Sequence, residues 1–476
     1  MPLNYPPNQS WPPSEWKPIY DKYAEWSAWY SGDPNKIANV FSSAVYTPTK
    51  SGRFWAREIK EERRVMLHIP IAGDLATTSS NLLFSESPKI ILPGGSPELT
   101  AKLEQIINAN GFYNTIIEAA EVCAALGGVF LKINWDKDLS PYPILNIAQV
   151  DNAIPEFKYG ILQAVTFWKI IDAEDEVHRL LERHEKGYIY SALYLGTQDN
   201  LGRQIPLTSR PETANIQPVV ATGINDILVR YIPNMMPNKL FRGSSVGQSD
   251  FGGSEGLMDA LDEVYTSWIR DIRLGQARII VPESYLIDVA TGKPKFDLDQ
   301  EVYVQMDYNP NDIQGANSIT QSQFNIRTEE HRQTSLELIA RIIANAGYSP
   351  QSFGLGAGSI SESGYALQIR EKKSFITTAK KARYWKTALE DILFLMLQLE
   401  NHSHSIRPSV EIQDSVTSDL SQIAQTVNLL YNASAISIRT AVQMVNHDMS
   451  EEQIELETKR ILAERGIQNP VPSQQA

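Results

Sequence analysis

The sequence predicts an α+β protein. Apolar residues recur at helical spacing over 362–399 and in several shorter segments. Residues 142–231 instead alternate short apolar runs with turn residues, a pattern typical of strands. A glycine-rich segment, 348–361, precedes the long helical segment and cannot form the interior of a helix or strand. Because helical and strand-like segments are separated along the chain, the pattern favours the α+β class over alternating α/β units.

Length and charge limit the function classes that fit. The chain has 476 residues, of which 42% are hydrophobic, so it can bury the cores of more than one domain. Its formal net charge is −13. Tight binding of duplex nucleic acid depends on Lys and Arg contacts to phosphates, so this balance argues against a protein that grips DNA over its whole surface. Any contact with DNA should involve a small surface.

One cysteine, Cys123, lies in an apolar helical segment and is expected to be a small buried hydrophobe. The count excludes a disulfide framework and cysteine-based metal sites. The N-terminal residues show no secretory signal pattern, and the longest apolar runs, such as 392–397, are too short to span a bilayer. These features predict a soluble protein made in a reducing cytoplasm, without a membrane partner.

Aromatic residues are dense in the first part of the chain. They could form a ligand cage, but the pattern favours packing against a domain or a neighbouring subunit. Helical spacing runs from Trp16 to Tyr30 and ends at the turn residues Gly32 and Pro34. The tryptophans concerned are Trp11, Trp16, Trp26, Trp29 and Trp55.

The next segments predict helices covering a sheet. Residues 63–84 indicate a strand followed by a helix. Ser96 is a helix N-cap with proline after it, and that helix should end at Gly111. A helix over 112–126 should end at Gly127, and a strand is expected over 129–135.

A break rich in Pro, Gly, Asn and Ser follows at 233–253. A helix is predicted over 254–274, then a strand-like insert over 276–307, then a second helix over 327–346 that ends at Gly347. Two helices therefore bracket a small β insert. The apolar stripe expected on the first helix consists of Leu257, Leu261, Val264, Trp268 and Ile272.

The C-terminal part predicts one strand within 402–414 and then only helices. These helices are expected over 418–431, 437–446 and 451–464, the last capped by Ser450 and stopped at Gly466. The tail 469–476 is expected to be disordered.

The glycine-rich segment admits three interpretations. A phosphate-binding loop would need a preceding strand and a Lys-Ser/Thr pair, whereas here a helix precedes and no lysine is present. The segment could instead be a flexible connector, or a loop that moves and touches a sliding surface. Small neutral residues with apolar Phe353 and Leu355 suit the third interpretation.

No catalytic or metal-binding constellation is predicted. His402 and His404 lack a third ligand at suitable spacing, and Asp297 with Asp299 lacks the further oxygens of a calcium loop. Nothing in the chain assembles a nucleophile, a base and an orienting acid. We therefore expect no enzyme activity, no cofactor and no metal.

The long helix carries a basic stretch opposite an apolar stripe. The stretch is either the solvated face of an amphipathic helix or a surface for DNA or a neighbouring subunit. Its members are Lys372, Lys373, Lys380, Lys381 and Arg383. The apolar stripe on the other face includes Ile376, Ala379, Ala382, Leu389 and Met396.

Several segments, taken in order, resemble the portal proteins of tailed double-stranded DNA bacteriophages of the siphophage type. The resemblance extends over nearly the whole chain and is carried by patterns rather than by a catalytic signature. The segments are WYSGDP, RYIPNM, GSSVGQSDFGGSEGLMDALDEVYTSWIRDIR, SISESGYALQIREKKS and SIRTAVQMVNHDMSEEQIELE.

The resemblance implies the portal fold and a division of the chain into portal parts. These parts are an α+β wing at 1–253, stem helices at 254–275 and 327–347, a clip with β structure at 276–326, a tunnel loop at 348–361, a long kinked wing helix at 362–400, a wing strand at 401–416, a helical crown at 417–468 and the tail at 469–476.

It also implies a function: a dodecameric ring at a unique capsid vertex of the virion, assembled in the host bacterial cytoplasm. DNA would pass through the ring during packaging and ejection. The implied partners are other copies of the chain, double-stranded DNA without sequence specificity, the large terminase, the head-completion adaptor, and the major capsid and scaffolding proteins. A non-portal head–tail adaptor or scaffold remains an alternative, and a nucleotide-binding enzyme a more distant one.

Two sets of site residues follow from the resemblance. The tunnel loop would present Gln351, Ser352, Phe353, Gly354, Leu355, Gly356, Gly358 and Ser359 to DNA. The clip would present Glu283, Asp288, Lys293, Lys295 and Asp297 to its partners.

Overall fold

A computed structural model describes most of the chain. The described residues are 3, 5–42, 54–55, 66–172, 176–275, 278–280, 320–322, 326–355, 364–400, 405–412, 420–446, 449 and 451–464. They form two compact units, each built from separate stretches of sequence. The first unit comprises Met1–Thr78, Glu121–Lys132 and Asn146–Pro350; the second comprises Ser79–Ala120, Ile133–Leu145 and Gln351–Ala476.

The helices lie close to the predicted positions, except for α2, which begins at Pro34, where the sequence predicts a turn. They are α1 (Lys17–Ser31), α2 (Pro34–Ser42), α3 (Ile71–Phe84), α4 (Pro97–Ala109), α5 (Phe112–Leu126), α6 (Glu255–Leu274), α7 (Thr328–Ala346), α8 (Gly364–Glu400), α9 (Leu420–Asn432), α10 (Ile438–Val445) and α11 (Glu451–Glu464).

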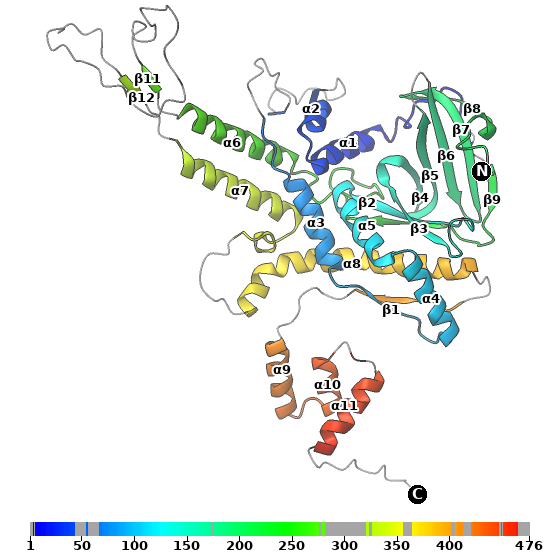
Figure 1. The fold of residues 1–476 in the computed structure, drawn as a ribbon, viewed down its shortest axis with the longest axis vertical. Coiled ribbons are helices and arrows are strands. Elements are labelled where there is room, and N and C mark those ends of the chain that lie inside the picture. The colour runs from blue at the N-terminus through cyan, green and yellow to red at the C-terminus, as the bar shows by residue number, and fades with distance from the viewer. Residues whose placement is uncertain are drawn as a thin grey trace, which may run out of the picture. The chain divides into compact units, whose positions relative to one another are not determined.

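The strands confirm the β-rich region, and with the helices they confirm the α+β class (Figure 1). They are β1 (Lys89–Ile91), β2 (Gly128–Asn134), β3 (Ile144–Gln149), β4 (Ala153–Lys158), β5 (Ile161–Asp172), β6 (Val177–Glu185), β7 (Tyr188–Thr197), β8 (Asn200–Ile205), β9 (Val219–Ala221), β10 (Val229–Pro233), β11 (Arg278–Ile280), β12 (Thr320–Ser322) and β13 (Ser409–Glu411).

The largest sheet is antiparallel, with strand order β4-β5-β6-β7-β8 and the short β9 paired to β7. A second sheet has the order β10-β2-β3, and two pairs, β1-β13 and β11-β12, complete the set of described strands. The β13 strand predicted within 402–414 is therefore present and pairs antiparallel with β1.

One predicted strand is wrong where the structure describes it. Residues 66–70, at the expected junction of strand and helix, adopt no strand, and α3 starts at Ile71. Their backbone bonds instead to side chains of α6: Leu67 N–H donates to Thr266 Oγ1 and Ile69 N–H to Asp262 Oδ1. A segment whose amides are satisfied by side chains does not need a strand partner.

The aromatic N-terminal arm packs against its own sheet rather than forming an open cage. Trp11 is buried with residues of β6, β7 and β8 in one core cluster. The buried guanidinium of Arg179, on β6, lies 5.9 Å from the ring centre of Trp11 and 5.6 Å from that of Trp168. Its NH2 donates to the carbonyl of Gln198 at 3.1 Å. The contact between Arg179 and Trp11, together with the hydrogen bond from Trp11 N–H to Asp199 O at 2.9 Å, therefore fastens the arm to the large sheet.

The buried face of α6 is acidic, which the predicted apolar stripe did not anticipate. Glu255 accepts from Trp26 Nε1 at 3.0 Å. Asp259 accepts from the N–H of Phe54 at 2.9 Å. Asp262 accepts from Trp55 Nε1 at 2.9 Å and lies 2.8 Å from His68 Nδ1. Of the predicted stripe, Leu261 is buried but Ile272 is exposed. Buried carboxylates are tolerated here because each receives hydrogen bonds from segments that precede α6.

Figure 1 shows α6 and α7 side by side and antiparallel, with β11 and β12 beyond their far ends. The sequence-based expectation of two helices bracketing a β-containing insert agrees with this arrangement. In the second unit, α8 packs against α4 and β13, and Phe84 meets Trp385 edge-to-face with ring centres 5.1 Å apart.

A charged cluster on the large sheet links stability to pH. Glu182 on β6 lies 2.8 Å from Lys132 Nζ and 2.5 Å from His184 Nε2. Burial alone would raise the pKa of Glu182, but His184 and Lys132 together outweigh it and lower that pKa to about 2. Burial lowers the pKa of His184. Both groups therefore bind protons less readily in the folded chain than in the unfolded chain.

We predict that acidification weakens this sheet in two steps. Below pH about 6.5, His184 takes up a proton in the unfolded chain before it does so in the folded chain. Below about pH 4.5 the same is true of Glu182. The free energy of unfolding therefore falls as pH falls. The thermal unfolding midpoint, followed by circular dichroism between pH 7 and 5, should drop less in His184→Gln than in the natural chain. Parallel pH curves for the two proteins would contradict the prediction.

Candidate functional site

The segment between α7 and α8 starts from a rigid helix end. Gly347 has φ +92° and donates its N–H to Ala344 O at 3.2 Å, while the N–H of Tyr348 reaches Ile343 O at 3.1 Å. These two bonds form a Schellman motif, which needs a left-handed residue and so favours glycine. The direction in which the chain leaves α7 is thereby determined.

Tyr348 is the anchor of this segment in the first unit. It is 1% exposed, and its hydroxyl donates to Asp250 Oδ2 at 3.0 Å. Asp250 Oδ1 accepts from Asn234 Nδ2 at 2.7 Å, and the backbone N–H of Asp250 donates to Ala124 O at 3.0 Å. The start of the segment is thus tied to the end of α5 and to the loop after β10.

The predicted break at 233–253 is a closely packed loop. Asn234 donates through its N–H to Gly127 O and through its side chain to Gln248 O, both at 3.0 Å. A Cβ on Gly247 would lie 2.2 Å from Gly127 O, so the two backbones approach closely only because glycine stands there. Glycine and asparagine here serve close packing and buried hydrogen bonds, not a flexible linker.

A second anchor of the segment lies in the second unit. Residues Pro350–Phe353 form a short 3-10 helix, and Ser352 Oγ lies 2.9 Å from Ser374 Oγ on α8. Gly354 has φ +73° with open space around its Cα.

Five of the eight predicted loop residues are described and lie next to these anchors: Gln351, Ser352, Phe353, Gly354 and Leu355. Gly356, Gly358 and Ser359 lie outside the described residues.

The side chains of the basic stretch of α8 differ in how far they are buried. Lys372, Lys373 and Arg383 are exposed and Lys380 is partly buried. Lys381 is 1% exposed, and its Nζ donates to Ser79 Oγ on α3 at 2.8 Å. The expectation that Lys381 belongs to an exposed basic face is therefore wrong.

Lys381 is buried because of which face α8 turns toward the interior. The buried face of its first half consists of Ser374, Thr377, Thr378 and Lys381, whereas Ile376, expected in the apolar stripe, is 60% exposed. The hydroxyl of Ser79 on α3 lies on this side of α8, so the ammonium group of Lys381 finds an acceptor inside the unit.

A cluster of charged and aromatic side chains fastens α6 to α7 near β11 and β12. Asp271 Oδ2 accepts from Arg327 NH2 at 2.8 Å and lies 3.0 Å from His331 Nε2. The ring of His331 stacks on Trp268 at 6.0 Å between centres. The His331 hydrogen bond, with help from Arg327, lowers the pKa of Asp271.

The insert beyond this cluster is described only through β11 and β12, which pair antiparallel. The five residues predicted for the partner surface of the insert lie outside the described residues. They are Glu283, Asp288, Lys293, Lys295 and Asp297. His402 and His404 also lie outside, as does Ser450.

Within the described ranges, no group of three or more His, Cys, Asp or Glu side chains could hold a metal ion. No helix in the same ranges is long and apolar enough to cross a membrane.

The family follows from a comparison with protein-family models. The model described as "Phage portal protein, SPP1 Gp6-like" matches residues 196–466, more than half of the chain. The chain belongs to this family. The match spans α6, α7, the segment that joins α7 to α8, and α8 itself. The portal resemblance in the sequence is thereby confirmed.

Solved structures with a related fold come from gene transfer agent (GTA) particles. One is the virion of a native particle, with 10% identity, a TM-score of 0.44, and coverage of 92% of this chain and 96% of that chain. Another is the neck of an empty particle computed with C6 symmetry, with 12% identity, a TM-score of 0.45, and coverage of 80% and 91%. A comparison with curated proteins found no match. The portal assignment rests on the family model alone.

We predict that Tyr348→Phe destabilises this portal protein by about 1–3 kcal/mol, because a buried carboxylate loses a hydrogen-bond donor. The measurement is the denaturant midpoint at unchanged m-value. Tyr159→Phe is the matched control, since Tyr159 is 93% exposed. Equal midpoints for the two variants would contradict the anchoring role of Tyr348.

We also predict that Lys381→Ala costs about 1–3 kcal/mol of stability, whereas Lys372→Ala changes it by less than about 0.5 kcal/mol. The first removes a buried side chain and its bond to Ser79; the second trims an exposed one. Chemical denaturation of both variants makes the comparison. If Lys381→Ala left the stability unchanged, Lys381 would have to be assigned to the exposed face instead.

Proposed function

We propose that this portal protein forms a ring of twelve copies at one vertex of a phage capsid and serves as the conduit for double-stranded DNA. The observation that carries the proposal is the portal family match over residues 196–466. The ring would be a component of the virion. DNA would enter through it during packaging and leave through it during ejection.

The proposed channel contact is the segment 348–361, the tunnel loop. Two anchors support this proposal: Tyr348 bonds to Asp250 in the first unit and Ser352 to Ser374 in the second. Residues 348–361 contain no charged side chain. A neutral loop with few long polar groups can touch a duplex without reading its sequence and without binding its phosphates tightly.

Charge supports a sliding rather than a gripping channel. Twelve copies, each with a formal net charge of −13, would carry −156 charges. A wall of this sign repels phosphate, so DNA can move along it without the retention that a basic channel would cause. The exposed Lys372, Lys373 and Arg383 of α8 would be local exceptions, facing DNA, a neighbouring copy or water.

We assign different partners to two segments of the chain, the insert 276–326 and residues 417–468. The insert 276–326, held on α6 and α7, would be the clip that docks the large terminase and later the head-completion adaptor. Residues 417–468 would be the crown, facing the capsid interior with its major capsid and scaffolding proteins. The protein itself would not hydrolyse nucleotide, and a separate motor would supply the work.

The rival functions predict different assemblies. A non-portal adaptor or scaffold need not form a closed ring, and a nucleotide-binding enzyme using Gly356 and Gly358 should bind nucleotide. Native mass spectrometry of the full chain, together with electron microscopy, separates the three. We expect closed rings with a central channel and no nucleotide binding; a persistent monomer at micromolar concentration would contradict the proposal.

We predict that deleting residues 355–358 leaves rings intact but blocks packaging or retention of DNA. This deletion starts after Ser352, so both anchors of the segment remain. Ring formation is checked by native mass spectrometry and packaging by nuclease protection of DNA in assembled heads. Normal packaging by intact rings of the deletion variant would overturn the proposed role of the loop.

A further inference from the structure

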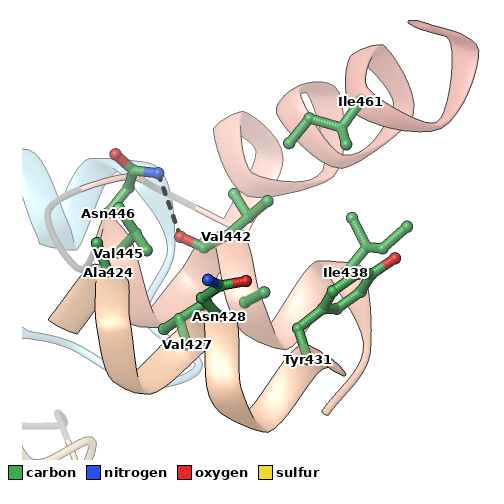
Figure 2. A pocket seen from close by; sticks show the side chains of 10 residues that line it. Ala424, Val427, Asn428, Tyr431, Ile438, Val442, Val445, Asn446 and Ile461 are labelled. Carbon is green, nitrogen blue, oxygen red and sulfur yellow. Dashed lines mark hydrogen bonds between the residues drawn. The ribbon is translucent and has the colours of Figure 1, made fainter. Parts of the chain in front are cut away.

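The three C-terminal helices enclose an apolar groove. Figure 2 shows its lining, which comes from one face each of α9 and α10 and from Ile461 of α11. The groove has a volume of about 330 Å³ and opens to the outside. At its edge, the side-chain amide of Asn446 donates to Val442 O at 3.3 Å. This bond satisfies one polar group of the lining within α10 itself.

These helices bury little of their own apolar surface. Among the described residues of 420–464, the buried hydrophobic side chains are Val427, Val442 and Ile454. In contrast, Leu429 is 71% exposed and Leu456 55% exposed. Among the side chains described here, three buried apolar groups make a small core for three short helices, which depend on burying an apolar face.

Charge is depleted on α9 and α10, the two helices that supply most of the groove lining. Residues 420–446 carry a single charged side chain, Arg439, whereas 21% of the whole chain is charged. A solvent-facing helix pair normally carries charges, and their depletion around exposed apolar residues is the pattern of an interface core.

The groove and Leu429 lie on opposite faces of α9. The α9 residues that line the groove are Ala424, Val427, Asn428 and Tyr431. At 3.6 residues per turn, Leu429 points roughly 150° away from the middle of that stripe. One copy of the chain therefore presents an apolar side chain on one side and an apolar groove on the other.

We propose that the groove of one copy receives Leu429 from the neighbouring copy, so that the C-terminal helices form a continuous belt around the ring. The proposal rests on the ring proposed above. Contacts of this head-to-tail kind use two different surfaces and close into a ring when the rotation between copies allows it. The helices would thus gain their missing core from the next copy.

The surface chemistry favours a second copy over other occupants. Nucleic acid would need cationic side chains, and α9 has none. A strongly charged protein partner would need countercharges, which α9 also lacks. A neutral surface of Asn, Gln and Thr around leucine suits a contact between identical chains, because like charges are absent.

Disulfide cross-linking of the full chain tests the contact. The variant Leu429→Cys/Ala441→Cys places one thiol on the outer face of α9 and one in the groove. The two positions face opposite ways in one copy, so a bond within a copy cannot form without melting α9. The natural Cys123 is buried and gives a low background. Oxidised rings should run as a ladder of dimers, trimers and larger species on a denaturing gel.

The controls are the two single-cysteine variants and the pair Leu456→Cys/Ala441→Cys. Rings whose Leu429 pair gives no ladder beyond the single variants would overturn the inference, and so would a ladder from the Leu456 pair alone. Absence of rings from the natural chain would instead contradict the proposed function, so the two failures are distinguishable.

A substitution gives an independent readout. Leu429→Asp should raise the protein concentration at which half of the rings dissociate by about tenfold or more, as expected for loss of a buried apolar anchor. Gln443→Asp adds the same charge to an exposed position of α10, on the side away from the groove, and should leave that concentration unchanged. Equal behaviour of the two variants in native mass spectrometry would count against the contact.

Discussion

Buried carboxylates that accept hydrogen bonds from distant segments are the constraint on which the first unit depends. The Asp250 carboxylate accepts from Asn234, at the start of the loop after β10, and from Tyr348, at the start of the segment after α7. On α6, Asp259 and Asp262 accept from Phe54, Trp55 and the backbone of Ile69. These partners belong to irregular chain, whose amides have no ladder to satisfy them. Carboxylates are strong acceptors, and each one left without its donors would be costly inside the protein.

This constraint bears on function through the position of the tunnel loop. A loop that touches moving DNA must yield at its tip while its base resists force. The Schellman end of α7 and the Tyr348–Asp250 bond supply a fixed base on one side, and the bond between Ser352 and Ser374 supplies one on the other. In the proposed ring, the neutral composition of the loop and the acidic balance of the chain would then favour passage of DNA over retention. Neither feature requires a catalytic residue.

The sequence predicted elements well where local chemistry decides them. Gly127 and Gly347 end α5 and α7 because only glycine readily adopts the left-handed conformation there, and Ser96 caps α4 through Leu99 N–H. Tertiary contacts decided the rest. Ile376 fits an apolar stripe by spacing, yet it is 60% exposed, whereas Lys381 is buried and bonds to Ser79 on α3. Similarly, residues 233–253 resemble a linker in composition, and nothing local reveals that Asn234 and Asp250 hold buried bonds. For the candidate site, composition reveals the glycine-rich segment 348–361 but not the side chains that anchor its start.

The most direct test of the central claim, a portal ring with the tunnel loop at its axis, is a symmetric electron cryomicroscopy map of the assembled full chain. We expect a closed ring in which residues 348–355 lie nearer the central axis than the large sheet β4–β8. A ring with this segment on its outer surface, or an assembly without a channel, would contradict it.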